Sequence, residues 1–165
     1  MNEPEAVVRA DYENLTKTLI ERKLTITLME SVTGGFLSSL ITDTEGASQV
    51  FRGSIVAYSN DEKIRAGVSE TVLKKHSVYS EEAAVEMAKA AEKRIPSDIA
   101  VGITGTTGNI DPNNVEASVP GEVFYAVSFR GDIESGKLIL TQKENRYQYK
   151  LEIAKAVYEA LKEKL

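Results

Sequence analysis

Leu24-Thr25-Ile26-Thr27-Leu28-Met29-Glu30-Ser31-Val32-Thr33-Gly34-Gly35 is the stretch that decides the fold. From residue 24 to residue 29, apolar residues alternate with threonine, a period-2 pattern that predicts a β-strand. After the Thr-Gly-Gly turn, Phe36, Leu37, Leu40 and Ile41 recur at the spacing of one helical face. The segment therefore predicts a strand, a sharp turn that exposes the Ser31 hydroxyl, and a helix.

This turn can offer a nucleophile and an anion site within five residues. Glycines let backbone N–H groups approach a ligand, and a helix N-terminus carries a positive partial charge. The simpler alternative is that Gly34-Gly35 is only a tight turn, with Ser31 or Thr33 as the N-cap of the helix.

Length and composition favour one soluble globular domain. The 165 residues can bury a real core, 42% of them are hydrophobic, and no cysteine is available for disulfides or thiolate chemistry. A formal net charge of −5 argues against nucleic-acid binding. No run approaches the roughly 18 apolar residues of a membrane span, and Met1-Asn2-Glu3 begins no signal peptide. We therefore expect a cytoplasmic protein that binds neither nucleic acid nor membrane.

The rest of the chain alternates helices with short strands. We expect helices at 4–22, 60–66, 69–76 and 80–94 and after Asn145, strands at 53–58 and 99–103, and a hairpin of 123–129 with 137–143 around 131–136. Residues 43–48 and 104–119 are expected to be loops. Early strands separated by helices, followed by a hairpin, predict a mixed sheet with helices on both faces.

A serine nucleophile needs a base, and two candidates are present. His76 is the only histidine, so a Ser-His-acid triad would depend on it alone, although its polar surroundings favour a solvated position. Lys63 is the second candidate, because a strand end followed by a short helix could return Tyr58 and Lys63 to the mouth of the first strand. A lysine can act as a base when burial lowers its pKa, and Tyr58 could orient the amine. The alternative is a surface lysine paired with Asp61 or Glu62.

Three further features could contribute to a site. Thr104-Gly105 follows a buried strand, where open α/β sheets bind ligands, and a plain turn explains it equally well. Arg146 begins the last helix and could bind phosphate with its planar fork, or be an ordinary surface charge. Asp111 with Asn109, Asn113 and Asn114 has a calcium-loop composition, but the spacing lacks the final glutamate of an EF-hand. We expect no metal site and no cofactor.

Six segments, in this order, resemble the C-terminal domain of CinA-type competence/damage-inducible proteins, the nicotinamide-nucleotide amidases. They are Glu30-Ser31-Val32-Thr33-Gly34-Gly35, Gly46-Ala47-Ser48 with Val50-Phe51, Val56-Ala57-Tyr58-Ser59-Asn60 with Lys63, Val78 with Ser80-Glu81-Glu82, Thr104-Gly105, and Gly121 before a strand. The likeness spans about residues 24–165. Six segments in register are far more specific than any single glycine motif.

The resemblance implies an α/β protein with a three-layer α/β/α sandwich around a mixed, mainly parallel sheet. Residues 1–165 would form a single amidohydrolase domain, with an N-terminal helix in 1–22. The family hydrolyses the carboxamide of nicotinamide mononucleotide to nicotinate mononucleotide and ammonia, in pyridine nucleotide salvage. The resemblance also implies a homo-oligomer and, because no large N-terminal domain precedes the match, the stand-alone form.

Residue roles also follow from the resemblance. Ser31 would be the nucleophile, activated by Lys63 and Tyr58. Substrate would be bound by Thr33, Gly34, Gly35, Asn60, Thr104, Gly105 and Arg146, with Arg146 meeting the phosphate.

Several departures from the family cluster where substrate should bind. Thr106-Thr107-Gly108-Asn109-Ile110-Asp111-Pro112-Asn113-Asn114 replaces a Gly-Pro-rich loop, Ser118-Val119-Pro120-Gly121 replaces Lys-Pro-Val-Gly, Glu144-Asn145-Arg146 replaces Gly-Asp-Arg, and Lys150 replaces a second arginine. The sequence therefore supports the chemistry better than the substrate. Two alternatives remain: a Ser-Lys amidase for another small amide, and a non-catalytic nucleotide-binding or interaction protein.

Overall fold

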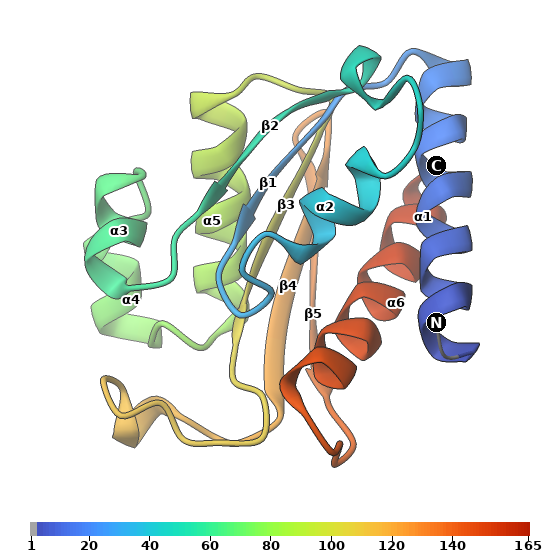
Figure 1. The fold of residues 1–165 in the computed structure, drawn as a ribbon. Coiled ribbons are helices and arrows are strands. Elements are labelled where there is room, and N and C mark those ends of the chain that lie inside the picture. The colour runs from blue at the N-terminus through green and yellow to red at the C-terminus, as the bar shows by residue number, and fades with distance from the viewer. Residues whose placement is uncertain (1–2) are drawn as a thin grey trace.

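The computed structural model describes residues 3–165 and shows one sheet between layers of helices (Figure 1). Met1 and Asn2, in the stretch where we expect no signal peptide, lie outside the described residues. The elements are α1 Glu3–Arg22, β1 Ile26–Glu30, α2 Phe36–Thr42, η1 Ala47–Gln49, β2 Phe51–Val56, α3 Asn60–Arg65, α4 Glu70–His76, α5 Glu81–Arg94, β3 Ile99–Gly105, η2 Val115–Ala117, β4 Glu122–Phe129, β5 Asp132–Ile139 and α6 Arg146–Lys164.

The sheet has the strand order β2-β1-β3-β4-β5. Strand β1 pairs in parallel with β2 and β3, whereas β3, β4 and β5 pair antiparallel. The chain steps from β1 outward to β2 and then returns to β3 on the other side of β1. Ligands of open α/β sheets bind outside the carboxyl ends of the strands at such a reversal, so the topology points to the end of β1. The expected α/β class and mixed sheet are confirmed.

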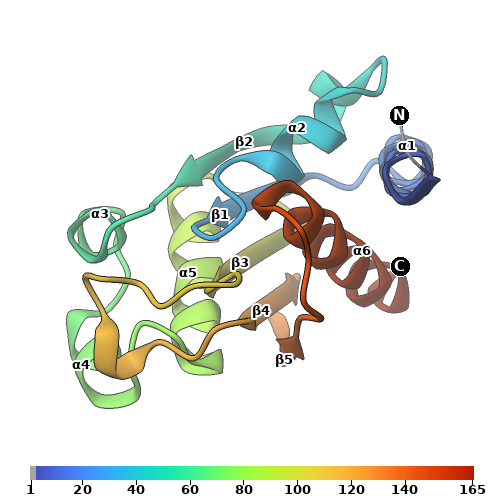
Figure 2. The same ribbon diagram turned by 60° about the horizontal axis from the view of Figure 1, so that its bottom comes forward.

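Helices cover both faces of the sheet (Figure 2). On one face, α6 and α2 pack on the strands and α1 packs outside them, where the Tyr12 hydroxyl donates a hydrogen bond to the Ala154 carbonyl at 3.0 Å. On the other face, α5 lies against β3 and β1, with α3 and α4 beside it. Helix α5 lies very close to β3 at Gly102. A methyl group on Gly102 would lie 2.1 Å from the Ala84 carbonyl oxygen, so α5 can pack here only against glycine.

The hairpin differs from the expectation. Phe129 pairs directly with Asp132, so the turn is the two residues Arg130 and Gly131, both with positive φ, and β5 begins five residues earlier than expected. Two-residue turns of this kind match the right-handed twist of a hairpin. Gly136, expected in the turn, lies within β5 under the ring of Tyr125, where a side chain would clash.

The core lies mainly between β1, β3 and β4 and the helices α1, α2 and α6. A second set of buried residues on the α5 side is smaller, because α5 presents mostly alanines to the sheet. Across residues 3–165, the helices are either too short or too polar to cross a bilayer.

Candidate active site

The turn after β1 is held by the side chain of Glu30, which is fully buried. Its carboxylate accepts hydrogen bonds from the Thr33 hydroxyl, from the backbone N–H groups of Gly35, Leu37 and Ser38, and from the Ser38 hydroxyl, at 2.6–3.1 Å. A carboxylate at the first turn of α2 satisfies donors that a helix N-terminus leaves unpaired. The carboxylate therefore fixes the turn that carries Ser31.

Ser31 lies at the carboxyl end of β1, and Lys63 comes to it from α3. Lys63 Nζ is 3.0 Å from Ser31 Oγ, a hydrogen-bond distance. The lysine is 1% exposed and Ser31 is 5% exposed, so the pair is buried in protein. A hydroxyl with a buried amine at this distance is a nucleophile–base arrangement.

Burial lowers the pKa of Lys63 from the ordinary 10.5 to about 8, because the charged form loses hydration. The negative charge of Asp111 opposes this effect and raises the lysine pKa. At pH 7, a lysine with a pKa of about 8 is neutral about a tenth of the time, whereas the free side chain is almost entirely protonated. Lys63 can thus accept a proton near physiological pH.

Tyr58 and Arg146 meet at the opening of the site. Arg146 Nη2 donates to the Tyr58 hydroxyl at 3.1 Å, and both side chains are exposed. Within residues 3–165, no hydrogen bond joins the Tyr58 hydroxyl to Lys63 or Ser31. The expectation that Tyr58 orients the lysine amine is therefore not met in this arrangement, since its hydroxyl contacts the arginine.

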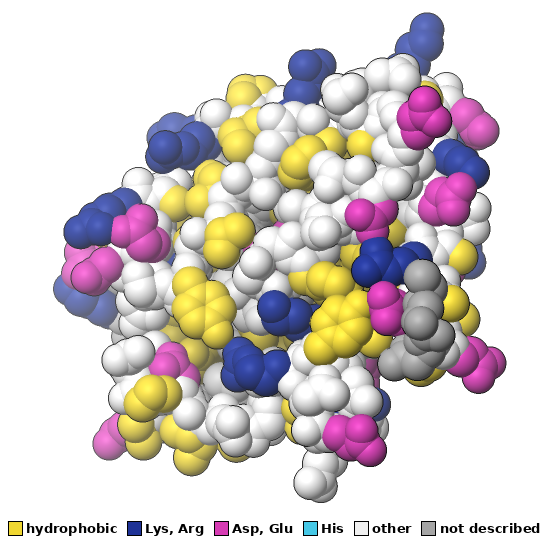
Figure 3. Space-filling view, in the orientation of Figure 1, with side chains coloured by type: hydrophobic (Ala, Val, Ile, Leu, Met, Phe, Trp, Pro, Cys, Tyr) yellow, Lys and Arg dark blue, Asp and Glu magenta, His cyan; other side chains and the backbone are white. Residues whose placement is uncertain are grey.

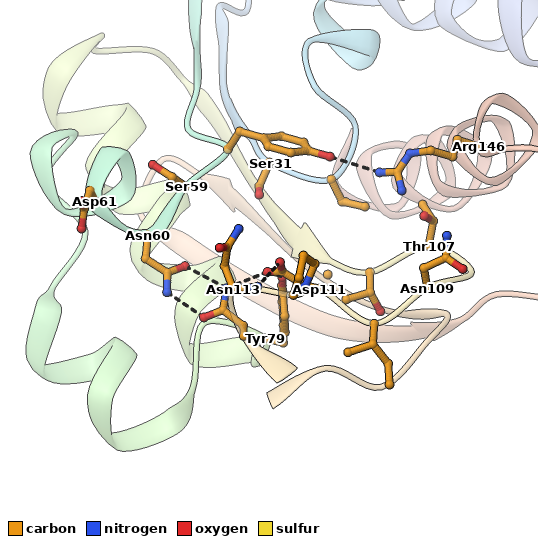
Figure 4. A pocket seen from close by; sticks show the side chains of 17 residues that line it. Ser31, Ser59, Asn60, Asp61, Tyr79, Thr107, Asn109, Asp111, Asn113 and Arg146 are labelled. Atoms are coloured by element: carbon orange, nitrogen blue, oxygen red, sulfur yellow. Dashed lines mark hydrogen bonds between the residues drawn. The ribbon is translucent and has the colours of Figure 1, made fainter. Parts of the chain in front are cut away.

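A pocket of about 570 Å³ opens over Ser31 (Figure 4). It is bounded by the end of β1, the start of α3, the segment that follows β3 and the first residue of α6. Its lining residues are Ser31, Val32, Tyr58, Ser59, Asn60, Asp61, Tyr79, Gly105, Thr106, Thr107, Asn109, Ile110, Asp111, Pro112, Asn113, Asn114 and Arg146. The pocket is thus at the strand-order reversal, where the topology points.

Basic side chains gather on this face between the β1–α2 turn and the amino end of α6 (Figure 3). Arg146 lines the pocket, and Lys150, one helical turn later, has its Nζ 3.6 Å from where a methyl group on Gly34 would lie. Cations placed four residues apart share one helix face. This face can attract an anion.

Four expected substrate-binding residues do not line the pocket: Thr33, Gly34, Gly35 and Thr104. The Thr33 hydroxyl and the Gly35 N–H donate to Glu30, and the Gly34 N–H donates to the Ser31 carbonyl. The Thr104 hydroxyl donates to the Val78 carbonyl at 3.0 Å. These groups are occupied within the protein, and the amino end of α2 holds Glu30 instead of a free anion site. Ser31, Asn60, Gly105 and Arg146 are brought together as expected.

Asp111 is a pocket residue whose role the sequence did not reveal. It accepts hydrogen bonds from the Tyr79 hydroxyl at 2.5 Å and from the Asn114 side-chain amide at 2.6 Å. Asn114 Oδ1 in turn accepts a hydrogen bond from the Asn60 side-chain amide. Burial acts to raise the pKa of Asp111, but these hydrogen bonds and the charge of Lys63 lower it overall. Burial and the bond to Asp111 raise the pKa of Tyr79 well above its ordinary value. The aspartate, as an anion, therefore joins the loop to the segment before α5 through Tyr79 and to the start of α3 through Asn114.

The histidine triad is not formed. His76 lies 3.3 Å from Glu82 and does not line the pocket that contains Ser31. Among the described residues, no group of three or more histidine or acidic side chains is arranged to hold a metal ion.

Known proteins resemble this chain in sequence and in fold. The family described as CinA C-terminal domain matches residues 9–165. A CinA-like protein of Flavobacterium psychrophilum is 38% identical over 134 residues, which are 80% of this chain and 31% of that protein. A CinA-like protein of Thermotoga maritima is 47% identical over 97 residues, covering 58% of this chain and 24% of that protein. The chain spans about a third of the length of the first two curated relatives it matches.

Solved structures share the fold. The competence-damaged protein (CinA) superfamily protein from Escherichia coli superposes with a TM-score of 0.87 at 24% identity, covering 96% of this chain and 90% of that one. The competence/damage inducible protein CihA from Agrobacterium tumefaciens gives a TM-score of 0.79 at 26% identity, covering 92% and 93%.

Proposed function

The chain belongs to the CinA C-terminal domain family, and from this premise we propose that it is an amidohydrolase that converts nicotinamide mononucleotide to nicotinate mononucleotide and ammonia. The observation that carries the proposal is the 3.0 Å contact between Lys63 Nζ and Ser31 Oγ at the base of the pocket. The pocket volume of about 570 Å³ falls within the range typical of small-molecule sites.

In the proposed reaction, the neutral Lys63 amine takes the proton of the Ser31 hydroxyl while the oxygen attacks the carboxamide carbon. The protonated lysine then gives this proton to the departing nitrogen, and ammonia leaves behind an ester on Ser31. Water attacks the ester, with Lys63 again taking the proton. The protonated Lys63 then gives this proton to Ser31 Oγ as the ester bond breaks, which restores the serine hydroxyl and the neutral amine, and the acid product leaves as a carboxylate with its proton released to water.

The negative oxygen of the tetrahedral intermediate needs hydrogen-bond donors. Val32 directly follows Ser31 and lines the pocket, and its backbone N–H makes no hydrogen bond within residues 3–165. An N–H next to the nucleophile is a common oxyanion donor. We assign this role to Val32.

The decisive experiment measures ammonia released from nicotinamide mononucleotide by the purified chain, with the nucleotide product identified. Ser31→Ala should remove activity and keep the fold, because loss of one turn hydroxyl costs at most about 1–2 kcal/mol. Ser39→Ala, on the exposed side of α2, is the matched control and should behave as wild type. Wild-type turnover by folded Ser31→Ala would end the proposal of a covalent mechanism.

A second candidate is an amidase of the same mechanism for a small amide without phosphate. The observation in its favour is Asp111, whose carboxylate lines the same pocket as Arg146 and repels a phosphate dianion. Faster hydrolysis of nicotinamide or another uncharged amide than of the nucleotide would identify this function.

A further inference from the structure

Thr107 carries the one buried side-chain polar atom that lacks a hydrogen bond within residues 3–165, its hydroxyl oxygen. The residue is 2% exposed and lines the pocket. Buried polar groups are nearly always paired, because an unpaired one loses its hydration without compensation. An unpaired hydroxyl at a pocket wall is therefore a group prepared for a ligand.

Neighbouring threonines show how unusual this hydroxyl is. Thr104 donates to the Val78 carbonyl and Thr106 donates to the Val119 carbonyl, so both are satisfied by the protein. The backbone at Thr107 is also fixed, since its carbonyl accepts from Gly121 N–H at 2.6 Å. The chain therefore holds the Thr107 backbone in place but leaves its buried hydroxyl without a hydrogen-bond partner.

Thr107 lies on the Arg146 side of the pocket. The next residue, Gly108, lies under Tyr149 of α6, where a methyl group would be 2.7 Å from the tyrosine oxygen. Arg146 is about one helical turn before Tyr149, and Figure 4 shows Thr107 below Arg146, with Ser31 to the left of both. A ligand whose reacting amide is at Ser31 would present its other end to Thr107 and Arg146.

We infer that Thr107 Oγ1 hydrogen-bonds an oxygen of the ribose 5-phosphate portion of the substrate, and so acts as a specificity-determining residue beside Arg146. A hydroxyl can both donate and accept, which suits sugar hydroxyls and phosphate oxygens alike. The inference takes the nucleotide nature of the substrate from the proposed function, but it requires no hydrolysis.

The inference predicts opposite effects of one substitution on stability and on binding. Thr107→Val keeps the shape and removes the unpaired hydroxyl, so the free protein should melt about 2–4 °C higher. The same variant should bind ribose 5-phosphate about 10-fold more weakly, since the ligand loses a hydrogen bond. Thr107→Ser keeps the hydroxyl and should bind as wild type does.

Thr27→Val is the matched control, because Thr27 is equally buried but its hydroxyl donates to the Gly53 carbonyl, outside the pocket. This control should melt lower than wild type and bind ribose 5-phosphate unchanged. The binding constants come from calorimetric titration with ribose 5-phosphate and, separately, with inorganic phosphate. Weaker binding of both ligands by Thr107→Val assigns the contact to phosphate, and weaker binding of ribose 5-phosphate alone assigns it to the sugar.

Unchanged ribose 5-phosphate affinity in Thr107→Val, or no binding by wild type, overturns the inference. A fall in both melting temperature and affinity also overturns it, because it would make Thr107 a structural residue. The titration involves no turnover, so it can succeed with a chain that hydrolyses no nucleotide. The titration can equally fail with a chain that does hydrolyse the nucleotide. Failure of this inference can therefore be distinguished from failure of the proposed function.

Discussion

Arg146, the first residue of α6, donates a hydrogen bond to the Tyr58 hydroxyl, 88 positions away in the chain, at 3.1 Å. The two side chains thereby join the segment after β2 to the last helix across the opening of the pocket. A guanidinium held by one partner keeps its remaining donors for another, and the planar fork suits phosphate. In this arrangement Tyr58 positions Arg146, and Lys63 contacts Ser31 directly.

Arg146→Ala should lower kcat/KM strongly for the nucleotide and only slightly for the nucleoside. Loss of one charge-assisted hydrogen bond of about 1.5–3 kcal/mol corresponds to a decrease of roughly 10- to 150-fold. Phosphate contacts remote from the amide can also raise the rate, because their binding energy positions the reacting group. The measurement is kcat/KM for nicotinamide mononucleotide and nicotinamide riboside. Arg52→Ala, exposed on β2, is the control, and equal losses on both substrates would remove Arg146 from phosphate binding.

Tyr58→Phe should raise KM for the nucleotide and leave the pH midpoint of kcat unchanged, because only the bond to Arg146 is lost. The expected loss in kcat/KM is about 5- to 10-fold, in line with one hydrogen bond. If the pH midpoint of kcat moves instead, the hydroxyl acts on Lys63 in the working enzyme.

The rate of hydrolysis should rise with pH and level off above a midpoint of about 8, since only the neutral Lys63 amine can take the serine proton. Asp111→Asn should move this midpoint to lower pH, because the aspartate charge raises the lysine pKa. Glu116→Gln, in the same loop, is the charge-matched control.

Lys63→Arg should lose nearly all turnover, as arginine stays protonated. A flat profile from pH 6 to 9 would argue against Lys63 as the base.

Lys63→Met should stabilise the protein at pH 7. The folded pKa of about 8 lies below the ordinary 10.5, so the unfolded chain binds more protons between these values and wild-type stability rises with pH there. The free-energy cost of burying the charged Lys63 amine is fully present below pH 8, where it lowers the free energy of unfolding by at most about 3 kcal/mol. This cost vanishes above pH 10.5. Urea unfolding at pH 7 and pH 10 measures it. A variant less stable than wild type at pH 7 would show that the bond to Ser31 outweighs the burial of charge.

Glu30→Gln should destabilise the fold by about 3 kcal/mol or more, because an amide nitrogen would face backbone donors in a fully buried position. Glu13→Gln is the control. Glu13 is paired with Lys17 on the surface, and such pairs contribute under about 1 kcal/mol. Denaturant midpoints compare the two, and equal shifts would mean that the Glu30 network contributes little.

The sequence predicted the elements and the edge of the sheet where the site lies. The strand before Ser31, the short helix with Lys63 and the helix begun by Arg146 follow from local patterns. Parallel strands then bring the first two to one edge. The predicted hairpin register was wrong. Glycine is typical of turns, so Gly136 was assigned to the turn together with Gly131, but the turn is only Arg130 and Gly131, and Gly136 lies in β5.

Hydroxyl direction could not be predicted from sequence. Thr33 and Thr107 follow strand ends, and Thr104, expected to begin a loop, lies in the last two residues of β3, yet the hydroxyls of Thr33 and Thr104 hydrogen-bond within the protein and that of Thr107 does not. The partners are Glu30 and the Val78 carbonyl, and their positions depend on how α2 and the segment before α5 pack. The hydrogen-bond partners of side chains depend on tertiary packing, whereas sequence periodicity indicates only local secondary structure.

The Glu30 carboxylate makes the residues of one pocket wall depend on one another, whereas the facing wall has separate hydrogen bonds. Residues 30–38 are joined by hydrogen bonds to the single side chain of Glu30, so a substitution of Glu30 leaves several buried donors unpaired at once. The facing wall, 105–119, takes its bonds from β4 and from Asn60 and Tyr79, and its sequence can be exchanged without touching residues 30–38. A loop grafted from a relative should therefore alter which ligand the pocket admits and leave the 30–38 turn in place, while loss of Asp111 with the old loop would lower the pKa of Lys63.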